Sequence, residues 1–408
     1  MSKIDELIAQ YCPHGVEYKE LGDVCNFRNG FAFKSSKFKV KGQPILRIGN
    51  IQNRNVDISN LIYFDTNDYS ENLKPFQVLN GDVLVAMSGA TTGKIGRLNS
   101  KEVFYLNQRV GKFEPNKELL QNNFLYHYLL TRSEELYVLA GGGAQPNLSS
   151  TVLMRRITIP IPPLPVQEAI VEILDKFTAL EAELEAELEA RTRQYEFYRN
   201  ELLSFEGKDV EWKTLGDIGE FTRGKRFVRT DMVESGFPCI HYGEMYTHYN
   251  IYATESKSFI KEELAEKLRK AKKGDVVIVA AGETIEDIGK ATAWLGESEV
   301  VTHDACFTFS SPLNPKFVAY FSRTKLFHNQ IKRYISSGKI SAINSKGLAQ
   351  AKIPVPSIEE QNRIVAILDK FDALVNDIST GLPAEIKARR EQYEYYRGKL
   401  LSFEPKSA

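Results

Sequence analysis

The sequence of 408 residues has few residues of the kinds that hold metals or form disulfides. It contains only four cysteines and six histidines. The cysteines, Cys12, Cys25, Cys239 and Cys306, are widely separated and form no CxxC pair. This spacing argues against a disulfide framework and against a structural zinc site. We therefore predict reduced, mostly buried thiols.

Long hydrophobic runs are also missing. The longest apolar stretches, such as DVVIVAAG at 275–282, are far shorter than the roughly 18 residues that indicate a membrane span. The first residues, MSKIDELIAQ, lack the apolar segment of a secretory signal peptide. With 42% hydrophobic and 26% charged residues, the composition is that of a folded globular protein. We expect a cytoplasmic protein.

No motif of a catalytic or nucleotide-binding site is complete. The run SGATTGKIG at 88–96 departs from the phosphate-binding pattern GxxxxGK[ST], because a serine replaces the first glycine and an isoleucine follows the lysine. The sequence contains no GxGxxG and no Asn-Pro-Pro-aromatic or Asp-Pro-Pro-Tyr motif of an amino-methyltransferase. His303 and Cys306 lie three positions apart without further ligands at a suitable spacing. We predict no catalytic residue and no metal site.

The chain is instead a tandem repeat. VEYKELGDVCNFRNG at 16–30 returns as VEWKTLGDIGEFTRG at 210–224, with eight identities at an offset of 194. At the same offset, IPIPPLPVQEAIVEILDKFTAL at 159–180 matches the run at 353–374 in thirteen positions. A third block, at 190–206, matches 388–404 at an offset of 198. The second copy therefore has four extra residues between its last two blocks.

Each copy has two parts of different character. The first part is rich in glycine and aromatic residues and contains short apolar runs bounded by Gly or Asp, such as GDVLVAMSG at 81–89, which are typical of buried strands. The second part has apolar residues every three or four positions, which indicates one long helix. We predict an α+β fold with four segments. They are a domain at 1–164, a central long helix at 165–206, a second domain at 207–357 and a second long helix at 358–408.

The second helix has a predicted interruption. Gly381 and Pro383 break its apolar stripe, and the proline ring should clash with the carbonyl of Ser379, so we expect a kink or two abutting helices near 381–383. The two apolar stripes are each other's best match, so the helices should pack together. Chain order then requires them to run antiparallel, which predicts a dumbbell with two heads related by a pseudo-two-fold axis.

The zero net charge conceals a separation. The two domains carry +4 each, whereas the central helix carries −7 and the second helix −1. A basic domain is able to approach phosphates, and an acidic helix is better suited to a basic protein partner. Basic residues alternate with aromatic ones at 27–41 and again at 221–229. The recurrence of this pattern in both copies favours a shared nucleic-acid surface.

These motifs together resemble the specificity subunit of a type I restriction-modification system. The resemblance covers essentially the whole chain, and the duplicated IPxP…Q…IVxILDKF and QYExYRxxLLSFE runs carry it most strongly. The family's fold consists of two target-recognition domains joined by an antiparallel pair of long helices that act as a coiled-coil spacer. The resemblance implies a non-catalytic DNA-binding subunit in which each head reads one half of a split, asymmetric target in double-stranded DNA.

The resemblance also implies partners and their cofactors. The helices would set the spacing of the half-sites and dock two methyltransferase subunits, which would recruit restriction subunits. S-adenosylmethionine would be held by the methyltransferase, and ATP and Mg²⁺ by the restriction subunit. Two other interpretations remain open. One is a recognition subunit for a partner that both cuts and methylates, and the other is a protein-binding scaffold without DNA.

Candidate DNA-binding residues follow from side chains that read base edges or contact phosphates. In the first head they are Arg28, Lys34, Lys37, Arg47, Lys94, Asn107, Gln108 and Arg109. In the second head they are Arg223, Lys225, Arg226, Arg229, His303, Lys332, Arg333 and Lys339. The candidate partner-binding positions of the helices are Phe177, Tyr195, Tyr198, Phe371, Tyr393 and Tyr396. For His303, a position inside the head is the alternative.

The central helix has a feature that suggests a ruler. Residues 180–190 read LEAELEAELEA, a four-residue period that keeps its leucines on one helix face. One additional LEAE unit would lengthen a helix by about 6 Å. This length is close to two base-pair steps of about 3.4 Å each. We expect such an insertion to change the gap between half-sites and neither half-site itself. An ordinary coiled-coil stretch is the alternative.

Overall fold

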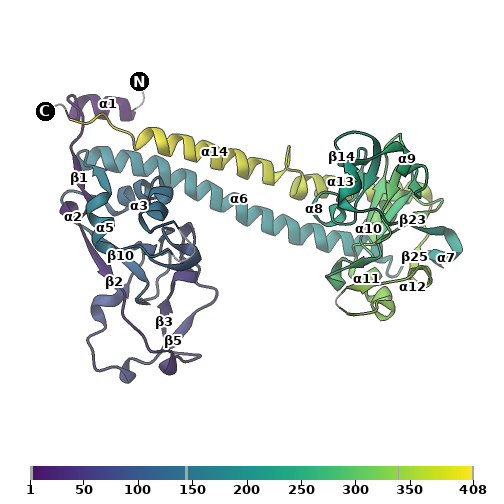
Figure 1. Ribbon diagram of the computed structural model, residues 1–408, viewed down its shortest axis with the longest axis horizontal. Coiled ribbons are helices and arrows are strands. Elements are labelled where there is room, and N and C mark those ends of the chain that lie inside the picture. The colour runs from purple at the N-terminus through teal and green to yellow at the C-terminus, as the bar shows by residue number, and fades with distance from the viewer. Residues whose placement is uncertain (1–2, 143–145, 339, 407–408) are drawn as a thin grey trace. The chain divides into compact units, whose positions relative to one another are not determined.

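The computed structural model describes residues 3–142, 146–338 and 340–406. The chain divides into two compact units (Figure 1). Unit 1 comprises Met1–Glu183 and Ile386–Ala408, and unit 2 comprises Leu184–Glu385. Each unit contains one head together with parts of the long helices, because the unit boundary passes through α6 (Leu164–Ser204). The fold is α+β, with two repeated domains joined by long helices, as the sequence predicted.

The head of unit 1 is built on three sheets. A five-stranded sheet has the order β2-β10-β7-β8-β4, a four-stranded sheet the order β5-β3-β9-β6, and β1 pairs with β11. The strands are β1 (Tyr18–Glu20), β2 (Cys25–Asn29), β3 (Gln43–Leu46), β4 (Arg54–Asn55), β5 (Ile62–Phe64), β6 (Gln77–Val78), β7 (Val83–Ala86), β8 (Ile95–Arg97), β9 (Phe104–Leu106), β10 (Val110–Pro115) and β11 (Thr158–Pro160). The glycine-bounded run at 81–89 forms β7, whose four residues are all buried.

The helices of unit 1 cover the larger sheet and share its core. They are α1 (Lys3–Tyr11), α2 (Leu21–Val24), α3 (Asn122–Leu130), α4 (Ser133–Leu139), α5 (Ser150–Arg156), the first part of α6, and α14 (Leu382–Leu400) from Ile386 onward. Ile170 and Leu174 of α6 are buried in the same cluster as Phe113 of the sheet and Phe124 of α3. The apolar stripe of α6 therefore packs into the head here, and not only against the second helix as the sequence analysis expected.

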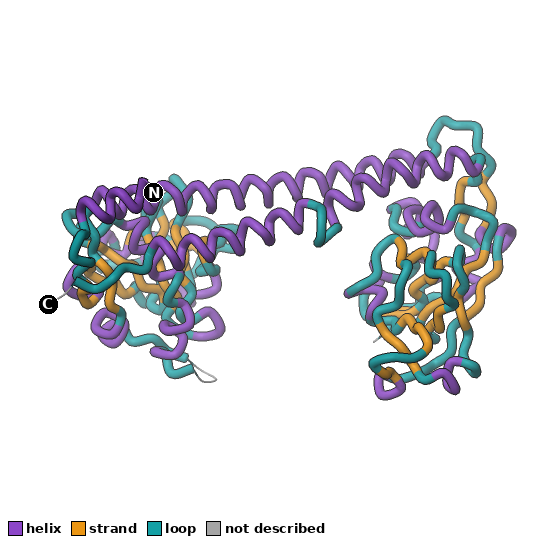
Figure 2. Tube along the Cα trace, turned by 90° about the horizontal axis from the view of Figure 1, so that it is seen from above, coloured by secondary structure: helices purple, strands orange, loops and turns teal. Residues whose placement is uncertain are grey.

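Within unit 1, α14 runs alongside α6 in the opposite direction (Figures 1 and 2). The ring of Phe177 stacks on that of Tyr396, with centroids 5.6 Å apart, and Glu181 forms an ion pair with Arg390. The segment before β1 meets the segment after α14, because the N–H of Val16 donates to the carbonyl of Glu404 at 2.8 Å. The carboxyl-terminal segment is thereby held on the head.

A buried histidine ties three elements of unit 1 together. Nε2 of His127 on α3 lies 2.8 Å from Oδ1 of Asp175 on α6, and Nδ1 lies 3.0 Å from the hydroxyl of Tyr393 on α14. Burial lowers the pKa of His127 although Asp175 opposes the shift, so the ring is neutral. Burial alone would raise the pKa of Asp175, but the His127 hydrogen bond and the charge of Arg97 outweigh it and lower the pKa. Nε2–H therefore donates to an ionised carboxylate.

Unit 2 repeats this architecture with a larger second sheet. Its five-stranded sheets have the orders β13-β23-β19-β21-β16 and β14-β17-β15-β22-β18, and β12 pairs with β25 and β20 with β24. The strands are β12 (Trp212–Thr214), β13 (Glu220–Arg223), β14 (Met232–Val233), β15 (Phe237–Ile240), β16 (Tyr252–Ala253), β17 (Ser258–Ile260), β18 (Lys270–Ala271), β19 (Val276–Val279), β20 (Ala281–Gly282), β21 (Ala291–Trp294), β22 (Val300–Thr302), β23 (Cys306–Ser310), β24 (Ser341–Ala342) and β25 (Lys352–Pro354). The run at 274–282 forms β19, which is the equivalent of β7.

The helices of unit 2 also pack into the head. They are α7 (Leu215–Ile218), α8 (Glu244–Thr247), α9 (Glu262–Ala265), α10 (Pro315–Phe321), α11 (Lys325–Ile331), α12 (Ser345–Ala349), α13 (Ile358–Asn376) and the second part of α6. Tyr195 of α6 donates from its hydroxyl to Oδ1 of Asp372 on α13 at 3.1 Å. Tyr320 of α10 donates to Oδ1 of Asp369 at 2.7 Å, which places Asp369 in the role that Asp175 has in unit 1.

The second long helix is interrupted over residues 377–381, mostly before the region 381–383 that the sequence predicted. α13 ends at Asn376 and α14 begins at Leu382. Pro383 is the second residue of α14, where its missing N–H costs no hydrogen bond. The carboxylate of Asp377 accepts hydrogen bonds from Ser379 and Thr380 in the connection, and these bonds lower the pKa of Asp377 to about 2.

The four cysteines are free and buried, as predicted. Burial raises the pKa of the Cys25, Cys239 and Cys306 thiols to about 12. A thiol with such a pKa is protonated at neutral pH and unreactive. Among the described residues, no helix is long and apolar enough to cross a membrane. The same residues contain no group of three His, Cys, Asp or Glu side chains that could hold a metal ion.

Candidate nucleic-acid interface

The two heads build one loop scaffold from different residues. The N–H of Phe31 donates to the carbonyl of Leu106 at 2.9 Å, and that of Lys225 donates to the carbonyl of Thr302 at 3.1 Å. In head 1 this bond joins the loop after β2 to the start of the turn before β10. In head 2 it joins the loop after β13 to the start of the turn before β23. The preceding residue is glycine in both heads, because a Cβ at Gly30 would lie 2.0 Å from the carbonyl oxygen that the turn presents.

A second pair of bonds fixes the next loop. The N–H of Arg47 donates to Oδ1 of Asn50 at 2.9 Å, and the N–H of His241 donates to Oε2 of Glu244 at 2.9 Å. Arg47 and His241 directly follow β3 and β15, so they occupy equivalent positions. The scaffold is therefore the same in both heads while the side chain that it presents differs.

Different side chains also occupy a pair of equivalent turns, which lie between β9 and β10 in head 1 and between β22 and β23 in head 2. Asn107, Gln108 and Arg109 form this turn in head 1, and His303, Asp304 and Ala305 form it in head 2. The predicted residues Asn107, Gln108 and Arg109 are thus brought together. Gln108 and Arg109 are exposed, and Oδ1 of Asn107 accepts the N–H of Gln108 at 2.8 Å.

The glycine-rich loop of head 1 joins the same edge. Asn147 forms a bridge with Ser88, and its Oδ1 lies 3.4 Å from Nη1 of Arg109. Lys94 lies half-buried at the end of the turn that begins at Ser88. The turn at 88–92, the turn at 107–109 and residues 146–147 therefore converge at one edge of head 1.

The other predicted residues of head 1 are placed less favourably for DNA contact. Arg28 lies on β2 and pairs with Glu114 at 3.5 Å. Nζ of Lys37 donates to the carbonyl of Asp68 and lies 4.4 Å above the Tyr69 ring, so its charge is already engaged. Lys34 is exposed in the loop after β2. Only Lys34 of these three leaves its ammonium free for a phosphate among the described residues.

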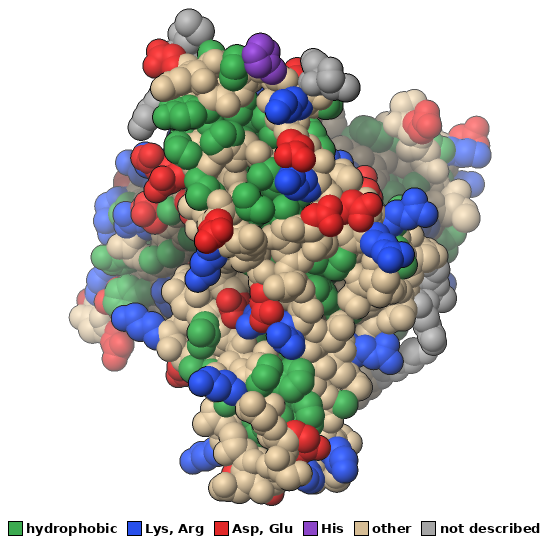
Figure 3. Space-filling model, turned by 90° about the vertical axis from the view of Figure 1, so that its left-hand side faces the viewer, with side chains coloured by type: hydrophobic (Ala, Val, Ile, Leu, Met, Phe, Trp, Pro, Cys, Tyr) green, Lys and Arg blue, Asp and Glu red, His purple; other side chains and the backbone are tan. Residues whose placement is uncertain are grey.

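Figure 3 shows how charge is distributed on one face of unit 1. In the foreground, Lys and Arg side chains are interspersed with Asp and Glu and with hydrophobic side chains. They do not gather into one broad basic patch on this face.

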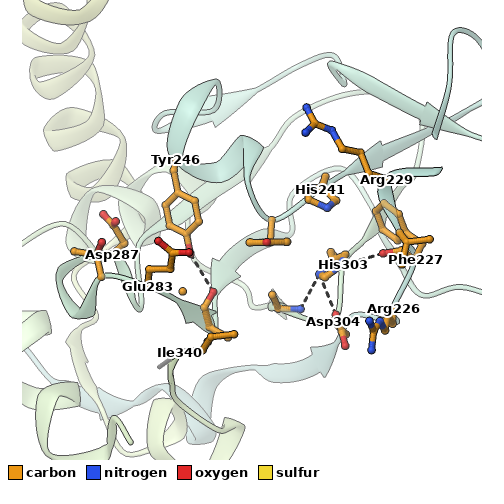
Figure 4. A pocket seen from close by; sticks show the side chains of 16 residues that line it. Arg226, Phe227, Arg229, His241, Tyr246, Glu283, Asp287, His303, Asp304 and Ile340 are labelled. Carbon is orange, nitrogen blue, oxygen red and sulfur yellow. Dashed lines mark hydrogen bonds and ion pairs between the residues drawn. The ribbon is translucent and has the colours of Figure 1, made fainter. Parts of the chain in front are cut away.

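In head 2 the loops enclose a cavity of about 590 Å³. Figure 4 shows Arg226 and Arg229 on one side of it and Glu283 and Asp287 on the other. His303 lies between these two sides. The predicted residues Arg226, Arg229 and His303 are therefore brought together at this cavity.

His303 supports this cavity and does not face outward. Its side chain is only 8% exposed, its Nε2 lies 3.1 Å from the carbonyl of Phe227, and its Nδ1 accepts the N–H of Ala305 at 3.1 Å. Burial lowers the pKa of His303 although Asp304 opposes the shift, so the ring is neutral and the contact with Asp304 is no ion pair. With both nitrogens used, His303 holds two loops together and has no donor for a base. The sequence-based role of His303 as a DNA contact is therefore corrected.

The remaining predicted residues of head 2 are scattered. Arg223 donates from Nε to the carbonyl of Asp304 at 2.9 Å, and Lys225 donates from Nζ to the carbonyl of Lys267 at 2.8 Å. Lys332 and Arg333 lie exposed on a short 3-10 turn (Lys332–Tyr334). Lys339 lies outside the described residues.

The residues that give the cavity its character were not among the candidates from the sequence. They are His241, Tyr242, Tyr246 and Glu283, of which Tyr242 and Tyr246 are 39% and 37% exposed. One signal was available, because His241 aligns with the candidate Arg47 when the two copies are compared. The other signal is the loop at 283–287, which is three residues longer than its equivalent at 90–91.

The predicted partner-binding residues fall into two groups. Phe371 stacks on Tyr198 with centroids 5.4 Å apart and planes 26° apart, and Phe177 stacks on Tyr396 at 5.6 Å and 20°. These two pairs are at least partly exposed. Tyr195 and Tyr393 are buried, with 4% and 1% exposure, and hold the helices to their own heads. The prediction that Tyr195 and Tyr393 contact a partner directly is therefore corrected, because both side chains have internal roles.

Comparison with known proteins identifies what this chain is similar to. The model of the type I restriction modification DNA specificity domain matches residues 13–190 and again 207–388. The specificity subunit of the EcoR124I and EcoR124II restriction enzymes of Escherichia coli is 34% identical over 80% of this chain and 82% of its own length. A putative type I specificity subunit of Haemophilus influenzae is 33% identical over 95% of this chain and 96% of its own length.

Solved structures share the fold. The specificity subunit of a type I restriction-modification system from M. genitalium covers 95% of this chain and 96% of its own length, with a TM-score of 0.56 and 17% identity. A chain from a structure on the assembly and conformational transition of the type I system covers 95% of this chain and 97% of its own length, with a TM-score of 0.58 and 16% identity.

Proposed function

Because the chain belongs to the family of type I restriction-modification specificity subunits, we propose that the loop edge of each head reads one half of its bipartite DNA target. Membership makes the chain a non-catalytic subunit that recognises DNA within a larger enzyme complex. The reading edge consists of the loops after β2 and β3 in head 1 and after β13 and β15 in head 2, the turn before β10 or β23, and residues 146–147 of head 1.

One observation carries this proposal. In both heads the N–H at the equivalent positions Arg47 and His241 donates to a side-chain oxygen three residues later, and the side chains that these loops present are exchanged. A protein that reads two different half-sites needs a constant scaffold with variable donors and acceptors, because each base pair presents its own pattern in the major groove. A scaffold for a single symmetric partner has no such need.

The helices offer matched surfaces for two partner subunits. The Phe177–Tyr396 stack of unit 1 recurs as the Phe371–Tyr198 stack of unit 2, and next to each stack lies a strongly exposed aromatic residue, Tyr395 at 65% or Phe197 at 62%. Exposed aromatic residues are enriched at protein interfaces. One methyltransferase subunit would dock on each surface.

The chemistry belongs to the partners. The methyltransferase subunits would hold S-adenosylmethionine, and restriction subunits that join the complex in the cytoplasm would use ATP and Mg²⁺. The uninterrupted α6, which includes residues 180–190, would set the gap between the half-sites. Insertion of one LEAE unit would then lengthen the gap and leave both half-sites unchanged.

Mapping of methylated bases tests the proposal. The chain is co-expressed with its methyltransferase partner in a host without DNA methylation, and modified adenines are located across the genome by single-molecule sequencing. We expect a split motif with a gap of fixed length. A continuous motif would contradict the two-head reading, and a soluble complex without methylation would contradict the function itself.

A further inference from the structure

The cavity of head 2 has walls of opposite chemistry, and this inference rests on the proposed function of that head. Arg226 and Arg229 form one wall, and Glu283 lies across from them (Figure 4). Both arginines are exposed, and neither has a hydrogen-bond or ion-pair partner within residues 3–142, 146–338 and 340–406. Their guanidinium groups are therefore available to phosphates or to the acceptor edge of guanine.

His241 adds a directed donor to this wall. Its Nδ1 accepts the N–H of Gly243 at 3.3 Å, so in the neutral ring the proton is carried by Nε2. Burial lowers the pKa of His241 although Glu244 opposes the shift, which favours the neutral ring at physiological pH. Within the described part of the chain, Nε2–H has no acceptor. His241 thus presents one hydrogen-bond donor of defined position beside the cavity.

Glu283 differs from these donors because its carboxylate accepts hydrogen bonds. It is exposed and lines the cavity, and no cation of the described residues pairs with it. The next carboxylate of the cavity, Asp287, is already paired with Lys290 at 2.6 Å. The loop that carries Glu283 has no counterpart of the same length in head 1, where the short turn at 90–91 has no acidic residue. The carboxylate of Glu283 is therefore a feature of head 2 alone.

A carboxylate at a DNA-reading edge is repelled by phosphates. This repulsion weakens binding unless a hydrogen bond from the DNA to the carboxylate offsets it. In the major groove only cytosine N4 and adenine N6 donate such a bond, whereas guanine and thymine present acceptors. We propose that Glu283 is a specificity-determining residue that requires a cytosine or adenine amino group at one position of the half-site read by head 2. The donors of His241, Arg226 and Arg229 contact the neighbouring acceptors.

Two variants of the full complex test this inference. Glu283→Ala removes the cavity carboxylate, while Glu286→Ala removes a carboxylate from an exposed residue of the same loop that does not line the cavity. Because both residues are exposed, neither variant should change the unfolding temperature. Methylation motifs are mapped for each variant, and binding is measured to duplexes with every base at each position of the half-site.

We expect Glu283→Ala to lose discrimination at one position of one half-site by on the order of tenfold to a hundredfold, since one base contact has about this effect. The other half-site should stay unchanged, and Glu286→Ala should retain the wild-type motif. An unchanged motif in Glu283→Ala overturns the inference, and so does an equal change in both variants, which would indicate a general charge effect. A wild-type complex without a split motif would instead overturn the proposed function.

Discussion

Heads 1 and 2 have one backbone plan and two sets of exposed side chains. Where head 1 presents Arg47, head 2 presents His241, and in both the N–H of that residue donates to a side-chain oxygen three residues later. Where head 1 has the short turn at 90–91, head 2 has an acidic loop at 283–287 that closes a cavity. The difference separates the residues that maintain the fold from those that are free to define a target. The first are the glycines and strands, and the second are the loop side chains.

The same comparison holds where each head meets its helices. Asp175 and Asp369 occupy equivalent positions, but Asp175 receives hydrogen bonds from His127 and Asn123, whereas Asp369 receives them from Tyr320 and Lys316. Either pair of donors satisfies a partly buried carboxylate. Different side chains therefore achieve the same docking, although only one of the two junctions contains a group that titrates near neutral pH.

The largest expected difference between the units is at Arg54. Its Nη1 lies 2.6 Å from Oε2 of Glu181, and both side chains are mostly buried, with 18% and 10% exposure. In unit 2 Val375 stands at the position equivalent to Glu181, and the loop instead meets the helix through a hydrogen bond of 3.1 Å from Asn250 to Asp372. We expect Arg54→Ala to destabilise unit 1 by about 2 kcal/mol, because it removes one of the two arginines that pair with the largely buried carboxylate of Glu181, while Arg390 remains. Asn250→Ala should destabilise unit 2 by about 1 kcal/mol.

Native-state hydrogen exchange measures these two effects separately, because it reports the opening of each unit. Arg54→Lys is the matched control, since it keeps the charge and loses the planar fork. An equal loss in Arg54→Ala and Asn250→Ala would show that the two junctions do not differ in strength.

A smaller expected difference between the units is the pH dependence of their stability. The pKa of His127 in folded unit 1 is lowered by burial, below its ordinary value of about 6.5. The unfolded chain therefore binds the proton first, so stability is fully present above about pH 6.5 and is lost as the pH falls below it. One such group contributes at most about 1.4 kcal/mol per pH unit.

His127→Gln should accordingly reduce the pH dependence of unit 1 stability between pH 5 and 7. The measurement is the unfolding free energy of unit 1 across this range, and His14→Gln, at an exposed histidine of the same unit, serves as the control. An undiminished slope in His127→Gln would place the titrating group elsewhere.

Much of the fold could be predicted from the sequence because it is duplicated. The offset of 194 defined two equivalent heads, and the four extra residues of the second copy coincide with the region in which α13 ends and α14 begins. Glycine and proline residues have strong local effects, so the helix interruption near Gly381 could also be placed. Such local rules do not depend on tertiary contacts.

The site was less predictable because burial decides the role of each polar side chain. His303 and Tyr393 are residue types that often bind partners. Inside the units, however, a ring nitrogen of His303 is hydrogen-bonded to Phe227 and the hydroxyl of Tyr393 to His127. The exposed Glu283, in contrast, was overlooked because acidic residues count against DNA binding in a charge inventory. Only the three-dimensional position of its loop opposite Arg226 gives it a role.

The central claim is that each head alone determines its half-site, and a head replacement tests it most directly. Residues 16–160 are replaced by a second copy of 210–354, and Thr178→Asp restores the partner that Asp372 provides to Asn250. The methylation motif of this chimera is then mapped with its methyltransferase partner. Our account predicts that both halves of the target become the half-site of head 2. Two halves that still differ would contradict it, because residues outside the heads would then be reading DNA.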